Sequence, residues 1–167
     1  MMKQYLMLVF WLLPLGVFAQ SDNFRVEVAT QGCLFYSDFK PYAFGGSLGY
    51  NITDRFFVNV KGEYAINMFK KDGVKSYDDC PVAGVNAGYT FLKSSLIDID
   101  GRLGFGDNFR KSENWRYSYY DAGIYGHLGN SKVKPIIGLG IRYYDSRNSY
   151  SKDYTRFYVS IGFGLNY

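Results

Sequence analysis

The chain has 167 residues and a formal net charge of +4 at pH 7, from 19 Lys and Arg against 15 Asp and Glu. This excess is small and scattered along the chain, which argues against nucleic acid as a partner. Aromatic residues make up 20% of the sequence, and 19 glycines accompany only 4 prolines. Such a composition is unusual for a soluble globular protein. It suits a membrane β-barrel, which needs aromatic girdles and small residues on a curved sheet.

The N-terminal stretch has the pattern of a secretory signal peptide. Lys3 gives a positive start, Leu6–Leu15 forms an apolar stretch, and a small-residue cleavage site ends at Ala19, before Gln20. The apolar stretch is shorter than the roughly 20 residues that a membrane-spanning helix needs, and Pro14 interrupts it. We therefore predict a cleaved leader over residues 1–19 and a single domain over residues 20–167.

Eight segments of alternating apolar and polar residues follow, and each is typical of a strand with one apolar face. In chain order, the predicted strands are about Phe24–Tyr36, Tyr42–Ile52, Phe56–Phe69, Val82–Leu92, Leu96–Gly106, Trp115–Leu128, Val133–Tyr144 and Phe157–Tyr167. Glycine-led triplets at Gly49, Gly88, Gly126 and Gly164 start 39, 38 and 38 residues apart, which suits one hairpin plus its loop. Four such repeats predict an all-β fold, an eight-stranded antiparallel up-and-down barrel.

The last predicted strand has an unbroken alternation of two faces. Its apolar face consists of Phe157, Val159, Ile161, Phe163, Leu165 and Tyr167. An exposed apolar edge strand would recruit other chains through its unpaired backbone groups. Closure of the sheet into a barrel removes that edge, so this strand also favours a barrel.

The connections between the predicted strands alternate in length. Short polar turns lie near residues 53–55, 93–95 and 129–132, and mostly longer polar loops cover 37–41, 70–81, 107–114 and 145–155. Outer-membrane barrels have short periplasmic turns and longer extracellular loops, so we expect two rims of this kind, each with an aromatic belt. The loops also carry Lys70, Lys71, Arg110, Lys111, Arg147 and Lys152. These charges could bind lipopolysaccharide phosphates, although a merely solvated loop surface explains them as well.

Three segments resemble the small outer-membrane β-barrel family of OmpX- and OmpA-type eight-stranded barrels: Leu48–Tyr64, Lys134–Tyr144 and Phe157–Tyr167. The resemblance covers Gln20–Tyr167 and implies an outer-membrane address, with membrane lipid and lipopolysaccharide around the barrel. In that family the terminal strand is the signal read by the barrel-assembly machinery. The resemblance therefore implies the same role for Phe157, Val159, Ile161, Phe163, Leu165 and Tyr167. It does not identify a ligand for the surface loops.

The alternation places five positive and five negative side chains on the inward faces of the strands. They are Arg25, Lys61, Arg102, Lys134 and Arg142 against Glu27, Glu63, Asp98, Asp100 and Asp121. An eight-stranded barrel has room inside for side chains and little more, and buried charges need partners. We predict a structural network of ion pairs, with an ion pathway as the alternative. For Arg102, we expect Glu63 and Asp121 as partners because all three lie near the middle of their strands.

The single histidine, His127, could act as a general base in a lipid-modifying enzyme, but the nearest candidate carboxylate on its strand, Asp121, is about 20 Å away. We therefore predict a structural, lumen-facing histidine and no catalytic residues. One histidine without a thiolate cluster does not predict a metal site. The Gly-x-Gly pairs lie inside strands with no helix after them, so they predict no phosphate-binding loop and no cofactor.

Cys33 and Cys80 are the only cysteines. In an oxidising compartment an even count suggests one disulfide, and both residues belong to the long-loop rim. Their strands are not neighbours, so the loop over residues 70–81 would have to fold across the barrel mouth to join them.

The sequence predicts an integral outer-membrane barrel with a filled lumen and a structural or surface-interaction role. The alternatives are a narrow channel for ions or small solutes, a lipid-modifying enzyme, and a soluble exported barrel of lipocalin type. The last of these would need its apolar face inside.

Overall fold

The computed structural model describes residues 23–35, 39–71, 74–108, 117–147 and 152–165. The leader expected over residues 1–19 and the final residue, Tyr167, lie outside these ranges. Within them, the chain forms eight strands, and no described helix is long and apolar enough to cross a membrane.

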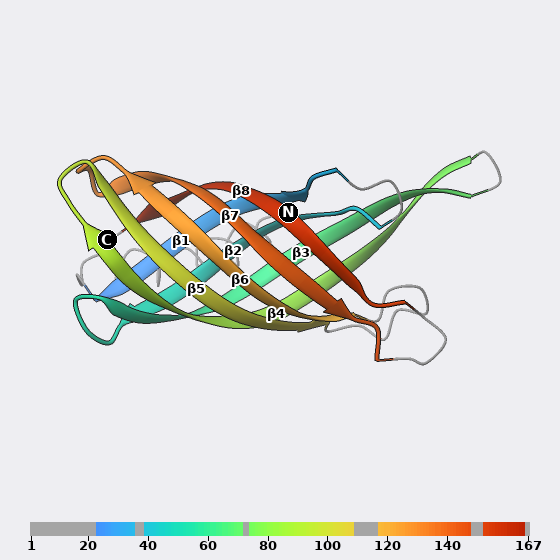
Figure 1. Ribbon diagram of the computed structural model, residues 1–167, viewed down its shortest axis with the longest axis horizontal. Helices are drawn as coiled ribbons and strands as arrows, with labels where there is room; N and C mark the ends of the chain where they lie inside the picture. The colour runs from blue at the N-terminus through green and yellow to red at the C-terminus, as the bar shows by residue number, and fades with distance from the viewer. Residues whose placement is uncertain (1–22, 36–38, 72–73, 109–116, 148–151, 166–167) are drawn as a thin grey trace, which may run out of the picture.

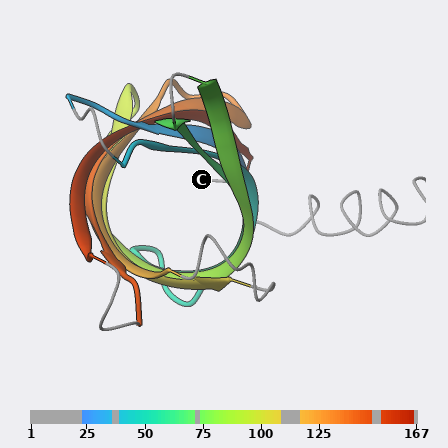
Figure 2. The ribbon, with the colours of Figure 1, turned by 90° about the vertical axis from the view of Figure 1, so that its right-hand side faces the viewer.

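The eight strands form one closed antiparallel barrel (Figure 1). They are β1 (Phe24–Cys33), β2 (Pro41–Asn51), β3 (Phe56–Lys71), β4 (Val74–Lys93), β5 (Ile97–Asn108), β6 (Ser118–Leu128), β7 (Val133–Asp145) and β8 (Tyr154–Leu165). Each strand pairs with the next along the chain, and β1 pairs with β8 from Val26↔Leu165 to Cys33↔Tyr158. Figure 2 looks onto the end that carries the loops and shows the ring closed by β1 and β8. The predicted fold is confirmed.

The connection between β3 and β4 differs from the prediction. The long loop expected over residues 70–81 is wrong: β3 and β4 continue their ladder as far as Lys71↔Val74 and project beyond the neighbouring strands (Figure 1). Pro81, the last residue of the expected loop, pairs with Tyr64 inside this ladder. On its other side, the pairing of β4 with β5 ends at Val82↔Asn108, so the missing N–H of Pro81 lies on an edge, where proline is tolerated.

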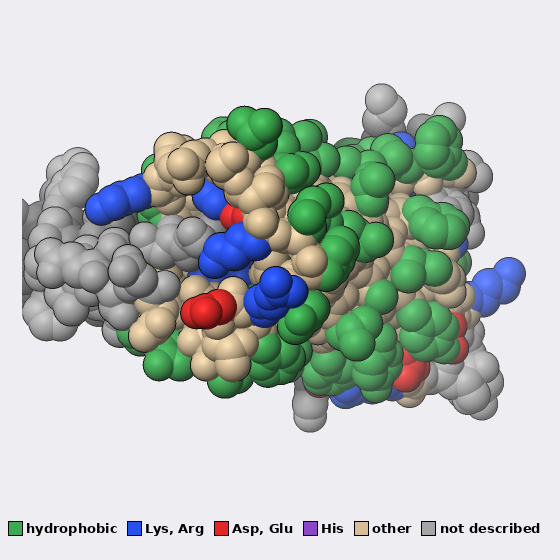
Figure 3. All heavy atoms as spheres, turned by 60° about the vertical axis from the view of Figure 1, so that its left-hand side comes forward, with side chains coloured by type: hydrophobic (Ala, Val, Ile, Leu, Met, Phe, Trp, Pro, Cys, Tyr) green, Lys and Arg blue, Asp and Glu red, His purple; other side chains and the backbone are tan. Residues whose placement is uncertain are grey.

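Apolar side chains cover the outer face of the barrel. Val60, Leu103 and Phe157 are 60–69% exposed on three different strands. Figure 3 shows hydrophobic side chains over the wall, while Lys, Arg and acidic side chains gather at the rim of the short turns. This arrangement is the opposite of a lipocalin-type barrel. At the loop end, Ser118 is 1% exposed, and its hydroxyl donates to Asp107 (3.1 Å).

Inward glycines let aromatic rings lie flat against the wall. A Cβ on Gly88 would stand 2.1 Å from the ring of Phe57, and a Cβ on Gly106 would stand 2.3 Å from the ring of Tyr119. Both distances are far below any real carbon contact. The Gly-rich strands therefore make room for aromatic side chains in a narrow lumen, which explains their high glycine content without a phosphate-binding role.

Candidate functional site in the barrel lumen

All ten charged residues that were expected on the inward faces lie in the lumen, and none of them is exposed. They separate into two clusters along the barrel axis. The short-turn cluster consists of Arg25, Glu27, Asp98, Asp100, Arg102, His127 and Lys134. The loop-end cluster consists of Lys61, Glu63, Asp121 and Arg142. Each cluster connects strands on opposite sides of the ring, β1 with β5 in the first and β3 with β7 in the second.

The short-turn cluster is centred on Asp100, which is 1% exposed. Arg102 donates to Asp100 from Nε (2.8 Å) and to Glu27 from Nη1 (2.6 Å), and Arg25 Nη2 donates to Asp100 Oδ2 (3.2 Å). The imidazole Nε2 of His127 lies 2.7 Å from Asp100 Oδ2 and 3.1 Å from Arg102 Nη2. His127 therefore takes part in the ion-pair cluster, at 1% exposure, as a lumen-facing side chain.

Two further features complete this cluster. Lys134 Nζ lies 2.5 Å from Asp98 Oδ2, nearer to the turns. The guanidinium of Arg25 lies 3.5 Å from the centre of the Phe57 ring, and that of Arg102 lies 4.2 Å from the centre of the Tyr125 ring. The faces of aromatic rings attract cations, so these rings help to compensate the arginines for lost water.

The loop-end cluster is centred on Arg142, which is 1% exposed. Its two Nη atoms donate to the two carboxylate oxygens of Glu63, each at 3.1 Å, and Nη2 also donates to Asp121 (2.7 Å). Lys61 Nζ lies 3.0 Å from Asp121 and 3.4 Å from Glu63. The hydroxyl of Tyr119 donates to Glu63 (2.7 Å), and the Arg142 guanidinium lies 3.7 Å from the centre of the Tyr119 ring.

The partners expected for Arg102 were wrong. It pairs with Glu27 and Asp100, whereas Glu63 and Asp121 pair with Arg142. The reason is the register of the tilted strands: Arg102 lies level with Gly123 on β6, and Asp121 is one inward position further toward the loop end. Alternation assigns a residue to a face of its strand, but it does not give its height in the barrel.

A polar gap separates the two clusters. A cavity of about 60 Å³ lies between them and is lined by Glu27, Lys61 and Arg102, among others, which leaves room for a few water molecules. Asn59 and Asn86 are cross-strand neighbours on the inner face at this level. The side-chain oxygens of both, and the amide nitrogen of Asn59, are buried without a protein partner. Buried amides of this kind are usually satisfied by ordered water.

Aromatic side chains close the loop end above the second cluster. Phe39, from the β1–β2 connection, is 6% exposed and packs among Tyr117, Tyr144 and Tyr154. Sequence analysis missed this group, because three of its four residues lie in loops or at strand ends. At the opposite end, a pocket of about 30 Å³ reaches Asp98, Asp100 and His127 from the turns.

The expected disulfide is not formed in the structure: Cys33 and Cys80 are free thiols, 1% and 0% exposed. Cys33 lies opposite Tyr158 at the β1–β8 seam, and Cys80 packs in an apolar cluster that includes Phe39 and Ala43. Residues 70–71 and 74–81 belong to the β3–β4 ladder rather than to a loop across the mouth. The segment that would have brought the two thiols together is therefore held in a sheet.

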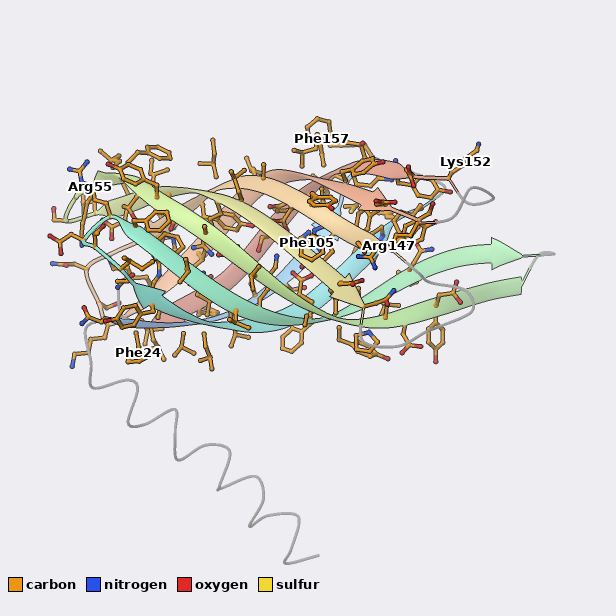
Figure 4. The ribbon with its side chains drawn as sticks, turned by 90° about the horizontal axis from the view of Figure 1, so that it is seen from below. Phe24, Arg55, Phe105, Arg147, Lys152 and Phe157 are labelled. Atoms are coloured by element: carbon orange, nitrogen blue, oxygen red, sulfur yellow. The ribbon has the colours of Figure 1, made fainter. Side chains whose placement is uncertain are left out.

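The apolar face of β8 lies on the outside of the barrel. Phe157, Ile161 and Phe163 are 58–60% exposed, and Val159 and Leu165 are half-buried. Among the basic loop residues, Arg147 pairs with Asp107 (3.1 Å), and Lys152 is exposed at the loop end, far from Phe24 and Arg55 at the short-turn end (Figure 4). Arg110, Lys111 and the side chains of Lys70 and Lys71 lie outside the described residues.

Within the described ranges, no group of three or more His, Cys, Asp or Glu side chains could hold a metal ion. The acidic residues of the lumen are instead distributed among arginines and lysines, as the distances above show.

Comparison with known proteins gives matches among solved structures alone. No protein-family model matches the sequence, and a search of curated proteins finds no match. One match comes from the de novo design of transmembrane β-barrels, with 14% identity, a TM-score of 0.48, and coverage of 86% of this chain and 94% of the other. Another is the N-terminal β-barrel domain of Pseudomonas aeruginosa OprF, with 14% identity, a TM-score of 0.47, and coverage of 84% and 97%.

Proposed function

We propose that this chain is an integral outer-membrane β-barrel with a filled lumen, whose role is structural or interactive at the cell surface rather than catalytic. The observation that carries the proposal is the contrast between the two faces of one wall. The outer face presents apolar side chains such as Leu103, and the inner face presents ten charges held in ion pairs.

The energetics of a bilayer support this assignment. In hydrocarbon each unsatisfied backbone polar group costs several kcal/mol, so a sheet can span a membrane only if it closes on itself. The ladder from β1 through β8 and back to β1 closes in this way. The outer-membrane address is our inference from this closure, from the leader pattern of residues 1–19 and from the family resemblance of the sequence.

A filled lumen is also part of the proposal, and a narrow channel is the competing function. Two clusters bridge opposite strands, and aromatic side chains close the loop end, which together favour a plug. The polar gap of about 60 Å³ is the observation that favours a channel. The contacts of His127 with Asp100 and Arg102 support a structural role for this residue rather than a catalytic role in a lipid-modifying enzyme.

Two measurements test the proposal. After expression in a Gram-negative host, the protein should remain in the outer-membrane fraction after a carbonate wash and show a folded band that shifts on heating. Recovery in the soluble fraction would contradict the membrane assignment. In planar bilayers the purified protein should give little current, whereas large and stable single-channel currents would replace the plug with the channel.

We further propose that membrane lipid and lipopolysaccharide surround the wall and that β8 is recognised by the barrel-assembly machinery. The alternation of Phe157, Ile161 and Phe163 on the outer face of the closing strand supports this role. Deletion of residues 157–167 should abolish the folded band, because β1 and β7 would be left with open edges. A deletion variant that still gives a folded, heat-shifted band would refute the assembly role.

A further inference from the structure

A polar cavity of about 450 Å³ lies at the short-turn end of the barrel, and we call it the turn-end vestibule. Its lining comes from several parts of the ring: the end of β2 and the turn after it, the last residue of β4, the β6–β7 turn and the start of β7. Its volume falls in the range of small-molecule sites. Figure 3 shows Lys and Arg side chains gathered at this end, which is the end that carries Arg55 in Figure 4.

The floor of the vestibule is electrically neutral. Lys134 lines it and pairs with Asp98 (2.5 Å between Nζ and Oδ2), and both residues are buried. A second pocket of about 30 Å³, which shares Lys93 with the vestibule, continues to Asp100 and His127. Since the cations and carboxylates of the short-turn cluster balance one another, the charge of the vestibule is set by its rim.

The rim has an excess of positive charge. Lys93 and Lys132 are exposed, and neither ammonium group forms an ion pair with a residue that the structure describes. Asp54, also exposed, is the acidic residue that the described lining contributes. Two cations therefore face one carboxylate around a concave surface. A cleft with low-dielectric walls concentrates such a field and attracts ions of the opposite sign, which here are anions.

The spacing of the two rim lysines favours a ligand with two anionic groups. Lys93 ends β4, whereas Lys132 lies in the turn between β6 and β7, so β5 separates them in the ring. Neighbouring strands are about 4.8 Å apart, which puts the two backbones roughly 10 Å or more apart along the rim. A single anion would have to draw two like charges together. A ligand with two anionic groups can contact each lysine separately.

The lining between the lysines is polar and uncharged. Asn51 contributes to it from the end of β2, and Asn130 contributes from the β6–β7 turn. An asparagine side chain offers both hydrogen-bond donors and an acceptor, which matches the hydroxyl groups of a sugar. The cavity therefore fits a hydroxylated frame that carries an anionic group toward each lysine.

We propose that the turn-end vestibule binds a small sugar-like ligand with two phosphate or carboxylate groups, and that Lys93 and Lys132 each contact one of these groups. Lys134 stays paired with Asp98 beneath the ligand. The short turns of outer-membrane barrels face the periplasm, so the ligand would come from that compartment. This inference goes beyond the structural role proposed above. Its test is done in detergent micelles, so its failure would leave the membrane assignment untouched.

The experiment titrates the protein in a non-ionic detergent with glucose 1,6-bisphosphate, glucarate and glucose, and calorimetry measures each Kd. The first two probes carry two phosphates or two carboxylates at the ends of the same six-carbon frame, and glucose tests the frame without charge. At least one of the two dianions should bind, and the tighter of them identifies the preferred anionic group. Binding should weaken as salt is raised, because both lysines are exposed. Glucose should not bind at the same concentrations.

Matched variants locate the site. Lys93→Met and Lys132→Met should each weaken binding by about threefold to fivefold, the range for one exposed charge contact, and the double variant should lose more than either. Asp54→Asn removes the opposing carboxylate and should tighten binding. Lys152→Met removes the same charge from the exposed loop end, and should leave the Kd unchanged.

Three results would overturn the proposal: no binding of either dianion at millimolar concentrations, equal binding of glucose, or an equal loss of affinity in Lys152→Met and Lys93→Met. The heat-shifted band of each variant checks that it is folded. Backbone amide NMR of the wild type gives a second measurement. The signals of Asp54 and Asn130 should shift as a dianion is added, whereas shifts confined to the loop end would refute the site.

Discussion

The two charged clusters of the lumen use the same chemistry in different surroundings. Both bridge opposite strands and both balance their charges, with three cations against three carboxylates near the turns and two against two near the loops. The short-turn cluster borders a pocket of about 30 Å³ that Asp98 and Asp100 share with the rim residues Asp54 and Arg55. The loop-end cluster instead lies beneath Tyr119 and the aromatic side chains around Phe39.

The two clusters differ in how easily water reaches their charged side chains. Breaking a buried ion pair is costly mainly because the remaining charge is left without compensation. Near the turns, water can reach a stranded carboxylate from the rim through the pocket. The loop-end cluster is covered on its rim side by aromatic side chains and has only the polar gap between the clusters on its other side. We therefore expect the cost of losing a cation to depend on which end of the lumen it occupies, more than on how many ion pairs it makes.

The largest expected effect is the loss of Arg142. Arg142→Met leaves Glu63 and Asp121 with only Lys61 between them, and should lower the free energy of unfolding by about 3–5 kcal/mol. Urea unfolding of the protein in lipid vesicles, followed by tryptophan fluorescence or by the heat-shifted band, measures this change.

Two matched variants test this comparison between the two ends of the lumen. Arg142→Met combined with Glu63→Gln keeps the Lys61–Asp121 pair and restores charge balance, so it should cost less than Arg142→Met alone. Lys134→Met strands Asp98 next to the turn-end pocket and should also cost less. Equal losses for Arg142→Met and Lys134→Met would show that access of water does not decide the cost.

The next effect concerns the outer face, one residue along β5 from the short-turn cluster. Leu103 is 69% exposed and lies beside Arg102, which faces the lumen. Leu103→Arg places a charge in hydrocarbon and should destabilise the protein by about 2–4 kcal/mol in bilayers if it lies near the midplane. Leu96→Arg, in the turn before β5, should cost about 0–1 kcal/mol.

The readout is again urea unfolding in vesicles, for both variants against the wild type. If Leu103→Arg were as stable as Leu96→Arg, Leu103 would not face lipid, and the assignment of the outer wall to the membrane would fail. If Leu103→Arg destabilised the protein only in the absence of a bilayer, the cause would be packing rather than contact with lipid.

How far the sequence predicts this molecule depends on which physical signal each feature leaves. Alternation with period two predicts the strands and the inward face of the ten lumen charges, because successive side chains point to opposite sides of a sheet. It missed Arg156, a buried residue near the start of β8. It does not predict the partners of Arg102, which depend on strand tilt and register. It also missed the β3–β4 extension, since Pro81 indicates a loop unless one knows that β5 ends beside it.

The packing of aromatic rings around Phe39 and the separation of the two charged clusters leave no local signal in the sequence. Phe39 meets Tyr154 across 115 residues of sequence, and nothing near either residue marks the contact. The expected Cys33–Cys80 bridge failed for the same reason, because it assumed a path for residues 70–81 that only the assembled barrel decides. Faces could be predicted, whereas heights and long-range contacts could not.

A smaller effect is expected from the glycines beneath the aromatic rings of each cluster. Gly88→Ala would push against Phe57, which supports Arg25, and Gly106→Ala would push against Tyr119, which supports Arg142. Overpacking of this kind costs about 1–3 kcal/mol. The sealed loop end should tolerate it less well, so Gly106→Ala should be the more destabilising of the two in urea unfolding.

The control for these variants is Gly62→Ala on β3, where an added Cβ would meet nothing within 4 Å. It should leave the unfolding midpoint unchanged or raise it slightly, because alanine restricts the unfolded chain. If all three variants unfolded at the same midpoint, the lumen would be loose enough to absorb a methyl group, contrary to the close packing described here.

The smallest effect lies outside both clusters, in the β7–β8 loop. The backbone N–H of Ser146 and the hydroxyls of Tyr143 and Ser146 donate to Asp153, and these bonds lower the pKa of its carboxyl below the ordinary value. A lowered pKa means that the carboxylate stabilises the loop above the pKa of an unfolded aspartate, and that this contribution is lost as the pH falls through the lower folded value. Because Asp153 is exposed, the loop should loosen in acid while the global unfolding midpoint stays the same.

An NMR titration of the Asp153 carboxyl carbon should give a midpoint below that of a reference peptide, and Ser146→Ala should move it upward. Asp153→Ala should speed amide exchange in the loop at neutral pH, with the difference from wild type vanishing in acid. A midpoint at or above the reference value would show that these hydrogen bonds do not persist in solution.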